Sequence, residues 1–171
     1  LMNQYKAHVL CLFDFSASAI YHAAETHLNV LDALQRHFLH ALQLSDEQAF
    51  LEHNLAPLRL RRDIAVLGLL HRVQLGDAHQ EFSSMFPLAG HQRTARTRHN
   101  ARRHGRQFQE VWGKTDYFNR SIFSALRVYN VLPEDVVDCK TVQRFQTLLT
   151  KRARHACQAG NARWARIFDA H

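Results

Sequence analysis

The segment from Leu58 to Leu75 constrains the fold most, because its apolar residues surround nearly the whole circumference of a helix. Two adjacent apolar faces arise at the helical spacing of about 100° per residue. They carry Leu60, Ile64, Leu67 and Leu75 on one side, and Val66, Leu69, Leu70 and Val73 on the other. Pro57 can occupy the first helical position, and Gly76 can end the helix in a left-handed conformation. Such a helix is stable only when other elements enclose it, so we predict that it is the most buried helix of the fold.

Helical periodicity also runs through most of the remaining chain, whereas strand signals are scarce. The patterns predict helices over residues 2–15, from Ile20 to Ala23, from an N-cap at Thr26 to Leu44, over 46–53, 78–86 and 162–170, and two helices hinged at Pro133 between Arg120 and His155. We therefore predict an all-α protein in three parts. A helical bundle covers residues 1–76, a linker helix and a long basic loop cover 77–117, and a C-terminal helical region that packs on the bundle covers 118–171.

Aromatic residues outside these helices are expected to complete the core. Phe108, Val111 and Trp112 follow the basic loop and should re-enter or cap the core. The C-terminal segment offers Trp164, Ile167 and Phe168, which should dock it onto the rest of the fold. Both expectations follow from the large apolar area that these side chains remove from water.

The last long helix has one apolar and one basic side. It begins near Asp138 or Thr141, either of which could accept a hydrogen bond from the first turn. Its apolar side carries Val142, Phe145, Leu149, Ala153 and Ala156, and the opposite side carries Lys140, Arg144, Lys151, Arg154 and His155. No acidic residue interrupts the chain from Cys139 to Phe168. Such a helix needs a core on one side and a polyanion, or only water, on the other.

A second basic element lies between His91 and Arg106. It contains Arg93, Arg96, Arg98, Arg102, Arg103 and Arg106, with no acid and no aliphatic residue larger than alanine. It cannot bury enough apolar area to offset the entropy of ordering, so we expect an exposed or disordered loop. A solubilising insertion would have the same composition, just as an ordinary solvated face would resemble the basic side of the last helix.

The charge of the chain is distributed unevenly. Residues 1–56 hold two basic and six acidic residues, whereas the remainder holds twenty basic and nine acidic ones. This asymmetry favours contact between the C-terminal two thirds and a polyanion, so RNA and/or DNA are the expected partners. The candidate nucleic-acid-binding residues are the six arginines of the loop together with Lys140, Arg144, Lys151 and Arg154.

Enzymatic motifs are missing from this sequence. It has no glycine-rich phosphate loop, no G-x-S-x-G and no H-E-x-x-H pattern. Thirteen histidines are present, but a metal site needs three or four convergent ligands, and His37 and His40 have no cysteine near them in sequence. Structural or surface roles are expected for them and for His71. We therefore expect no catalytic residue, no metal, no cofactor and no small-molecule substrate for this chain.

Cysteine usage and hydropathy bear on the compartment. Cys11, Cys139 and Cys157 are odd in number and widely separated, which favours a reducing, intracellular compartment over a disulfide scaffold. The mean hydropathy is -0.34, and no apolar run reaches the length of a membrane span. No leading signal pattern is present. A nuclear or cytoplasmic protein that neither is secreted nor enters a membrane is expected.

Three stretches of the chain resemble the region after the palm of LINE-type (non-LTR) retrotransposon reverse transcriptases. The first is YKAHVLCLFDFSASAIYHA with LNVLDALQRHFLHAL, and the second is LAPLRLRRDIAVLGLLHRVQLG. The third is RRHGRQF followed by FNRSIFSALRVYNVLPEDVVDCKTVQRFQTLL. Matching residues are Asp14, Phe15, Tyr21, His22, Leu31, Asp32, Gln35 and Leu39 in the first, Pro57, Leu58, Arg61, Arg62, Asp63 and Leu67 in the second, and Asn130, Leu132, Pro133, Val136, Val137, Val142, Phe145 and Leu148 in the third. Tyr129 stands where tryptophan is common.

This resemblance implies a thumb-like helical bundle that continues into further amphipathic helices. The fingers, the palm and its metal-binding aspartates are absent, and Phe15 and Ser18 depart from the usual Tyr and Pro. The chain would then be a non-catalytic fragment of an RNA-directed DNA polymerase, and divalent metal would belong only to the missing palm. By implication, the thumb grips the template–primer duplex, and the basic tail holds element RNA or target DNA. The alternative is a helical protein-interaction module with no nucleic-acid role.

Overall fold

The computed structural model describes residues 1–89 and 104–169, and it confirms the all-α fold. The structure is mostly helical (65%), and the described residues form no strand or sheet. One isolated antiparallel bridge joins Leu88 to Phe108. The predicted basic loop falls mainly on residues 90–103, which lie outside the described ranges.

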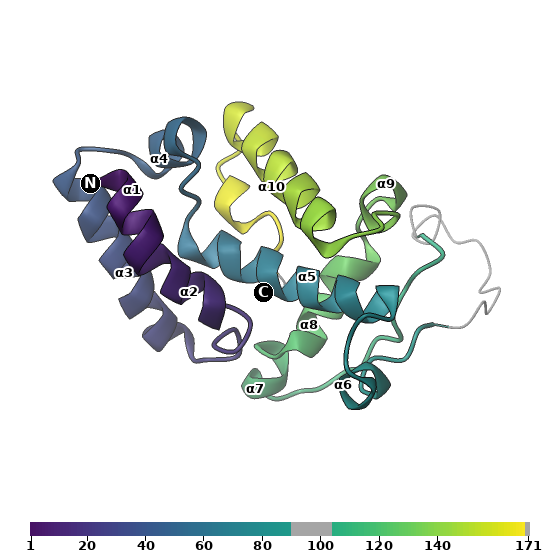
Figure 1. Ribbon diagram of the computed structural model, residues 1–171. Helices are drawn as coiled ribbons and strands as arrows, with labels where there is room; N and C mark the ends of the chain where they lie inside the picture. Colours follow the sequence, from purple (N-terminus) through teal and green to yellow (C-terminus); the bar gives the residue numbers. More distant parts are fainter. Residues whose placement is uncertain (90–103, 170–171) are drawn as a thin grey trace.

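Helix α5 (Leu58–Leu75) crosses the middle of the molecule, with α10 (Val142–Gln158) on one side and α8 (Ile122–Asn130) on the other (Figure 1). Eleven of its eighteen residues are buried, more than in any other described helix. The predicted central helix is therefore confirmed. Pro57 is its N-cap rather than its first residue, and Gly76 ends it in the left-handed region at φ 79°, where the absence of a Cβ removes the steric penalty.

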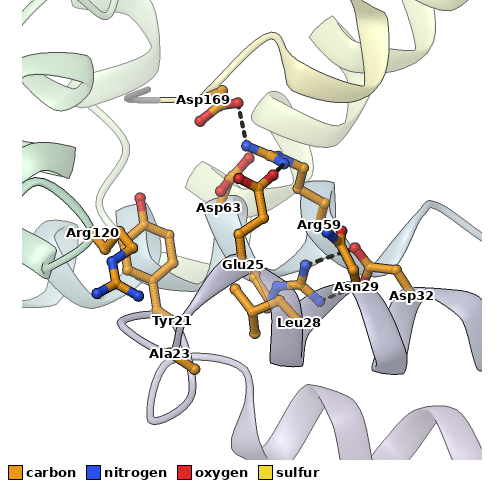
Figure 2. Close-up of a pocket in the computed structure, with 11 residues that line it drawn as sticks. Tyr21, Ala23, Glu25, Leu28, Asn29, Asp32, Arg59, Asp63, Arg120 and Asp169 are labelled. Atoms are coloured by element: carbon orange, nitrogen blue, oxygen red, sulfur yellow. Dashed lines mark hydrogen bonds and ion pairs between the residues drawn. The ribbon is translucent and has the colours of Figure 1, made fainter. Parts of the chain in front are cut away.

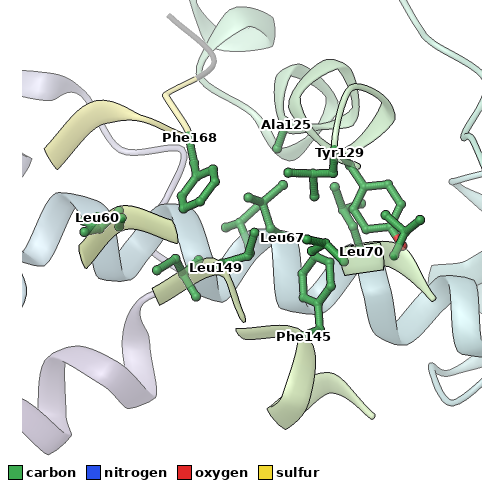
Figure 3. Close-up of a cluster of buried hydrophobic side chains, with 14 of the residues drawn as sticks. Leu60, Leu67, Leu70, Ala125, Tyr129, Phe145, Leu149 and Phe168 are labelled. Atoms are coloured by element: carbon green, nitrogen blue, oxygen red, sulfur yellow. The ribbon is translucent and has the colours of Figure 1, made fainter. Parts of the chain in front are cut away.

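The main hydrophobic core lies where α5 meets α8 and α10 (Figure 3). Leu67 and Leu70 come from α5, Tyr129 comes from α8, and Phe145 and Leu149 come from α10. All five side chains are at most 1% exposed. The apolar side that the sequence assigns to α10 is therefore the side that packs on α5.

A buried histidine forms two hydrogen bonds within this core. His71 is fully buried and stacks on Phe145 with ring centroids 4.1 Å apart. Its Nε2–H donates to the Cys139 carbonyl oxygen at 2.8 Å, so Nδ1 accepts from the Tyr129 hydroxyl, also at 2.8 Å. Burial lowers the pKa of His71, although the bond to Cys139 opposes that effect. The structural role expected for this histidine is confirmed.

The N-terminal helices pack around a second, smaller cluster. Helix α1 (Met2–Gln4), a π-helical stretch η1 (Tyr5–Leu10) and α2 (Cys11–Ser16) form one continuous helical run that packs against α3 (Glu25–Ala41). Tyr5 stacks on Phe38 with ring centroids 3.9 Å apart and an interplanar angle of 10°. Helix α4 (Asp46–His53) begins with a capping box in which the side chains of Ser45 and Gln48 each accept from the other's backbone N–H.

Three expectations for this region are wrong. Residues 20–23 form turns rather than a helix, and α3 is capped by Ala24 instead of Thr26. Ala24 is extended, and the Thr26 hydroxyl lies 3.4 Å from the His27 ring instead of bonding a backbone N–H of the first turn. The helix also ends at Ala41 rather than Leu44, because Gln43 turns the chain through a positive φ of 55°.

Short helices connect α5 to α10. They are α6 (Gln80–Ser84), α7 (Asp116–Asn119) and α9 (Glu134–Val137). The Thr115, Ser121 and Thr141 side chains cap α7, α8 and α10 by accepting a backbone N–H of the first turn. Of the two caps considered for α10, Thr141 is therefore the one used. None of the helices in the described residues combines the length and apolarity required to cross a membrane.

The aromatic residues after the basic segment do not all enter the core. Phe108 is 1% exposed and meets Tyr129 edge to face at 5.1 Å. Val111 and Trp112 remain exposed, Trp112 to 72%. The expectation that Trp112 caps the core is wrong, because Phe108 already occupies the position against Tyr129.

The C-terminal segment docks through two of its three predicted anchors. Trp164 stacks on Phe50 of α4 with ring centroids 5.2 Å apart, and Phe168 is buried in the main core. Ile167 is 39% exposed, so it is not an anchor. The predicted helix over residues 162–170 is reduced to a single 3-10 turn, η3 (Trp164–Arg166).

Replacing Leu67 with Ala tests the central position of α5. Leu67 is 1% exposed within the main core, so the truncation should lower the free energy of unfolding by about 2–5 kcal/mol. Urea denaturation followed by circular dichroism measures the change. The exposed Leu34→Ala is the control and should change stability by less than about 0.5 kcal/mol. A loss below about 1 kcal/mol for Leu67→Ala would show that α5 is not the centre of the core.

Candidate nucleic-acid interface

The outer side of α10 carries an exposed basic surface, which we call the basic face. Arg144, Lys151 and His155 lie on the side of the helix opposite the buried residues, and Lys140 is exposed just before the helix begins. Their spacing of seven and four residues keeps the three helical side chains in one row. The sequence prediction of a basic ridge opposite the apolar side is therefore met by these four residues.

No carboxylate neutralises the basic face in the described part of the chain. The side chains of Lys140, Arg144 and Lys151 take part in none of the ion pairs or side-chain hydrogen bonds there. The chain also has no acidic residue from Cys139 to Phe168. Their charged groups are therefore free to contact phosphates.

Arg154 lies on the flank of α10, away from the basic face, and its guanidinium binds the end of α4. It donates to the carbonyl oxygens of Phe50 at 3.1 Å and Leu51 at 2.9 Å, and to Asn54 Oδ1 at 2.8 Å. It also lies over the Phe50 ring, 5.2 Å from the centroid. These contacts satisfy carbonyl groups that the end of a helix leaves without partners, so the structure gives Arg154 a role in packing α10 against α4.

Only the ends of the basic segment lie within the described residues. Arg93, Arg96, Arg98, Arg102 and Arg103 lie outside the described residues. Arg106 is half-buried, donates to the Val137 carbonyl oxygen at 3.1 Å and pairs with Asp138 at 3.3 Å. On either side of the segment, the backbone N–H of Ala89 donates to Gln107 at 2.7 Å, and that of Gln109 donates to Pro87 at 2.8 Å. The two ends of the segment are thus held together.

Arg59, Arg61 and Arg62 of α5 differ from the arginine of the basic face because each is paired with a carboxylate, whereas Arg72 of the same helix is exposed and forms no ion pair in the described residues. Arg59 pairs with Glu25 at 2.9 Å and Asp169 at 2.5 Å, as Figure 2 shows. Arg62 forms a bidentate pair with Asp32 at 2.7 and 3.0 Å, and Arg61 pairs with Asp14. These pairs join α5 to the N-terminal helices and the C-terminal segment. Their charges are already neutralised.

The same region contains a partly open pocket of about 100 Å³. Asp63 lines it and is 6% exposed, and its Oδ2 has no hydrogen-bond partner among the described residues. Burial raises the pKa of the Asp63 carboxyl well above its usual range, and the neighbouring Asp169 raises it further. Arg59 and Arg62 oppose the shift without cancelling it. Burial likewise raises the pKa of Tyr21, which lines the same pocket.

The described residues bring no three histidine, cysteine or acidic side chains close enough to hold a metal ion. No protein-family model, curated protein or solved structure matches this chain. Function is therefore inferred from the chain's own residues and their geometry.

One feature of the surface was not predicted from the sequence. The guanidinium carbon of Arg127 lies 4.2 Å from the centroid of the exposed Trp112 ring. The two residues are fifteen positions apart and belong to no periodic pattern, so only the fold brings them together.

Replacing Arg154 with Gln tests its structural role. Loss of the guanidinium bonds to α4 should lower the free energy of unfolding by about 1–2 kcal/mol. Arg144→Gln, on the basic face of the same helix, is the matched control and should leave stability within about 0.5 kcal/mol. Thermal and urea denaturation measure both variants. Equal stability of the two variants would contradict the assignment.

Asp63→Asn tests the buried carboxyl through pH. Because the pKa of Asp63 is raised in the fold, the unfolded carboxyl ionises first, near pH 4, and stability then falls as pH rises towards the folded pKa. Asp63→Asn removes the ionisable carboxyl and therefore this loss of stability. Its stability relative to wild type should therefore increase from about pH 4 upward, as measured by urea denaturation between pH 4 and 8. The exposed Asp77→Asn should show no such trend. A pH-independent difference for Asp63→Asn would contradict the raised pKa of the Asp63 carboxyl.

Proposed function

We propose that this chain binds nucleic acid without catalysing a reaction, through the phosphates of the polynucleotide. The observation that carries the proposal is the basic face of α10, where Lys140, Arg144 and Lys151 are exposed without a carboxylate partner. Arg59, Arg61 and Arg62 of α5, in contrast, are paired with carboxylates. Cations left free on one surface are what a polyanion requires.

The geometry of α10 suits a polynucleotide backbone. Eleven residues separate Arg144 from His155, which corresponds to about 16 Å along a helix. Duplex DNA carries one charge per ~1.7 Å of its axis, so several phosphates pass within reach of a row of that length. Guanidinium groups bind phosphate in a bidentate manner. Such contacts position a nucleic acid without reading its sequence.

The resemblance to LINE-type reverse transcriptases supplies the biological setting of the proposal. In that setting the chain is the thumb and tail of an RNA-directed DNA polymerase and holds template–primer, element RNA or target DNA. The catalytic aspartates and their metal ions belong to a palm that is not in this sequence. We include the arginines from Arg93 to Arg103 among the proposed phosphate contacts because of their sequence alone.

A protein-interaction module is the second candidate function. It is favoured by apolar side chains that the N-terminal helices leave exposed: Leu12 and Phe15 on α2, and Val30 and Leu34 on α3. Phe15 is 93% exposed. This function would need no free cations, so removing charge from α10 separates the two candidates.

Arg144→Gln tests nucleic-acid binding. Affinity for a duplex and for a single-stranded oligonucleotide is measured by fluorescence anisotropy at several salt concentrations. Affinity should fall steeply with salt, and the variant should reduce the slope of log K against log salt by about 0.7–0.9, which corresponds to one lost phosphate contact.

The matched control is Arg36→Gln, which removes the same charge from an exposed position on the acidic N-terminal half. It should leave the salt slope unchanged. Affinity that does not depend on salt, or equal effects of the two variants, would exclude the basic face as the binding surface and leave the protein-interaction module as the better explanation.

A further inference from the structure

An exposed tryptophan and an arginine form a stacked pair away from the basic face. Trp112 lies between Phe108 and α7 and is 72% exposed, whereas the other tryptophan, Trp164, is 5% exposed. The guanidinium of Arg127, from α8, lies over the indole ring at 4.2 Å. One side of the indole is therefore covered by a cation, and most of its remaining surface is open to solvent.

The position of Trp112 is fixed by the residues that follow it. A Cβ on Gly113 would lie 2.3 Å from the Phe118 ring, so only glycine allows the backbone to approach that ring so closely. Phe118 stacks on Phe123 with ring centroids 5.6 Å apart and an interplanar angle of 3°. Phe123 in turn meets Phe86, which is buried in the main core. The turn after Trp112 thus rests on a row of aromatic rings that reaches the core.

Arg127 has unused hydrogen-bonding capacity. No acceptor in the described part of the chain bonds its guanidinium, and its buried Nε has no partner. The charged residues closest to Trp112 and Arg127 in the sequence include Lys114, Arg120, Glu110 and Asp116. Glu110 already accepts from Asn130 at 3.2 Å, and Lys114 is exposed without an ion pair in the described residues.

We infer that Trp112 and Arg127 form a binding site for one unpaired nucleotide of a single-stranded nucleic acid. The base stacks on the open side of the indole, and its phosphate accepts hydrogen bonds from the Arg127 guanidinium. This inference rests on the proposed function and names the class of polynucleotide that reaches this site. Base stacking on aromatic rings is available to every base, but only when the base is not stacked inside a duplex.

The chain places this site close to the basic segment. Trp112 follows Phe108 by four residues, so it lies within about 14 Å of the bridge that joins the two ends of that segment. An exposed tryptophan and a free guanidinium together resemble the combination of stacking and charge that single-strand binding proteins use.

Fluorescence tests the site directly, because the exposed Trp112 and the buried Trp164 respond differently to ligands. The probe is oligoadenylate of about 12 nucleotides, within the range of known single-strand site sizes, as RNA and as DNA. It should quench Trp112 emission in the wild type and leave Trp112→Phe, whose remaining emission comes from Trp164, unquenched. Both probes should act, since stacking does not require the 2′-hydroxyl.

Affinities of variants complete the test. Trp112→Leu should weaken oligoadenylate binding by about 5- to 150-fold, whereas Trp112→Phe should retain most of the affinity. Arg127→Gln should weaken binding and reduce the salt slope by about 0.7. Neither change at Trp112 should alter duplex affinity or thermal stability.

These measurements distinguish failure of the proposed function from failure of the nucleotide site alone. If neither single strand nor duplex binds the wild-type chain, the proposed function and this site both fall. If oligoadenylate binds through Arg144 but Trp112→Leu leaves its affinity unchanged, only the nucleotide site is overturned. An equal loss of duplex affinity in Trp112→Leu would also overturn it, because a duplex has no unpaired base to stack.

Discussion

The structure depends on the enclosure of α5. Because apolar residues cover nearly its whole circumference, α5 must be surrounded, and the packing of α8, α10 and the C-terminal segment against it satisfies that requirement. Two of its buried polar residues are satisfied in different ways: His71 bonds Tyr129 and Cys139, whereas Arg62 pairs with Asp32. Hydrophobic burial sets the arrangement of the helices, and these polar contacts restrict it to one geometry.

Carboxylates divide the arginines of this protein into two groups. Arg59, Arg61 and Arg62 of α5 pair with acidic residues of the N-terminal half and the C-terminal segment, so their charge is used within the fold. Arg144 on the outer side of α10 pairs with no acid in the described residues, whereas Arg152 of the same helix pairs with Asp135 at 3.1 Å. Arg154 illustrates why composition alone does not separate the groups, since Lys151 and His155 of the same helix are exposed while the Arg154 guanidinium binds α4.

Sequence periodicity was sufficient for the fold class, the central helix and the basic side of α10, because burial follows directly from helical spacing. It was less reliable where several residues competed for one role. Thr26 looked like a helix cap, but Ala24 adopts the extended conformation that begins α3. Trp112 looked like a core residue, but Phe108 already filled the space against Tyr129. The Trp112–Arg127 pair joins distant positions and could not be predicted from spacing.

The bridge between Leu88 and Phe108 has a consequence for how this chain can diverge. Its backbone bonds hold both ends of the intervening segment against the folded body, with Phe108 buried and His104 donating to the Tyr129 carbonyl oxygen. Doubling the length of a closed loop costs only about 0.6 kcal/mol in entropy. Insertions, deletions and changes of charge between these anchors can therefore accumulate over evolution while the helical core stays intact.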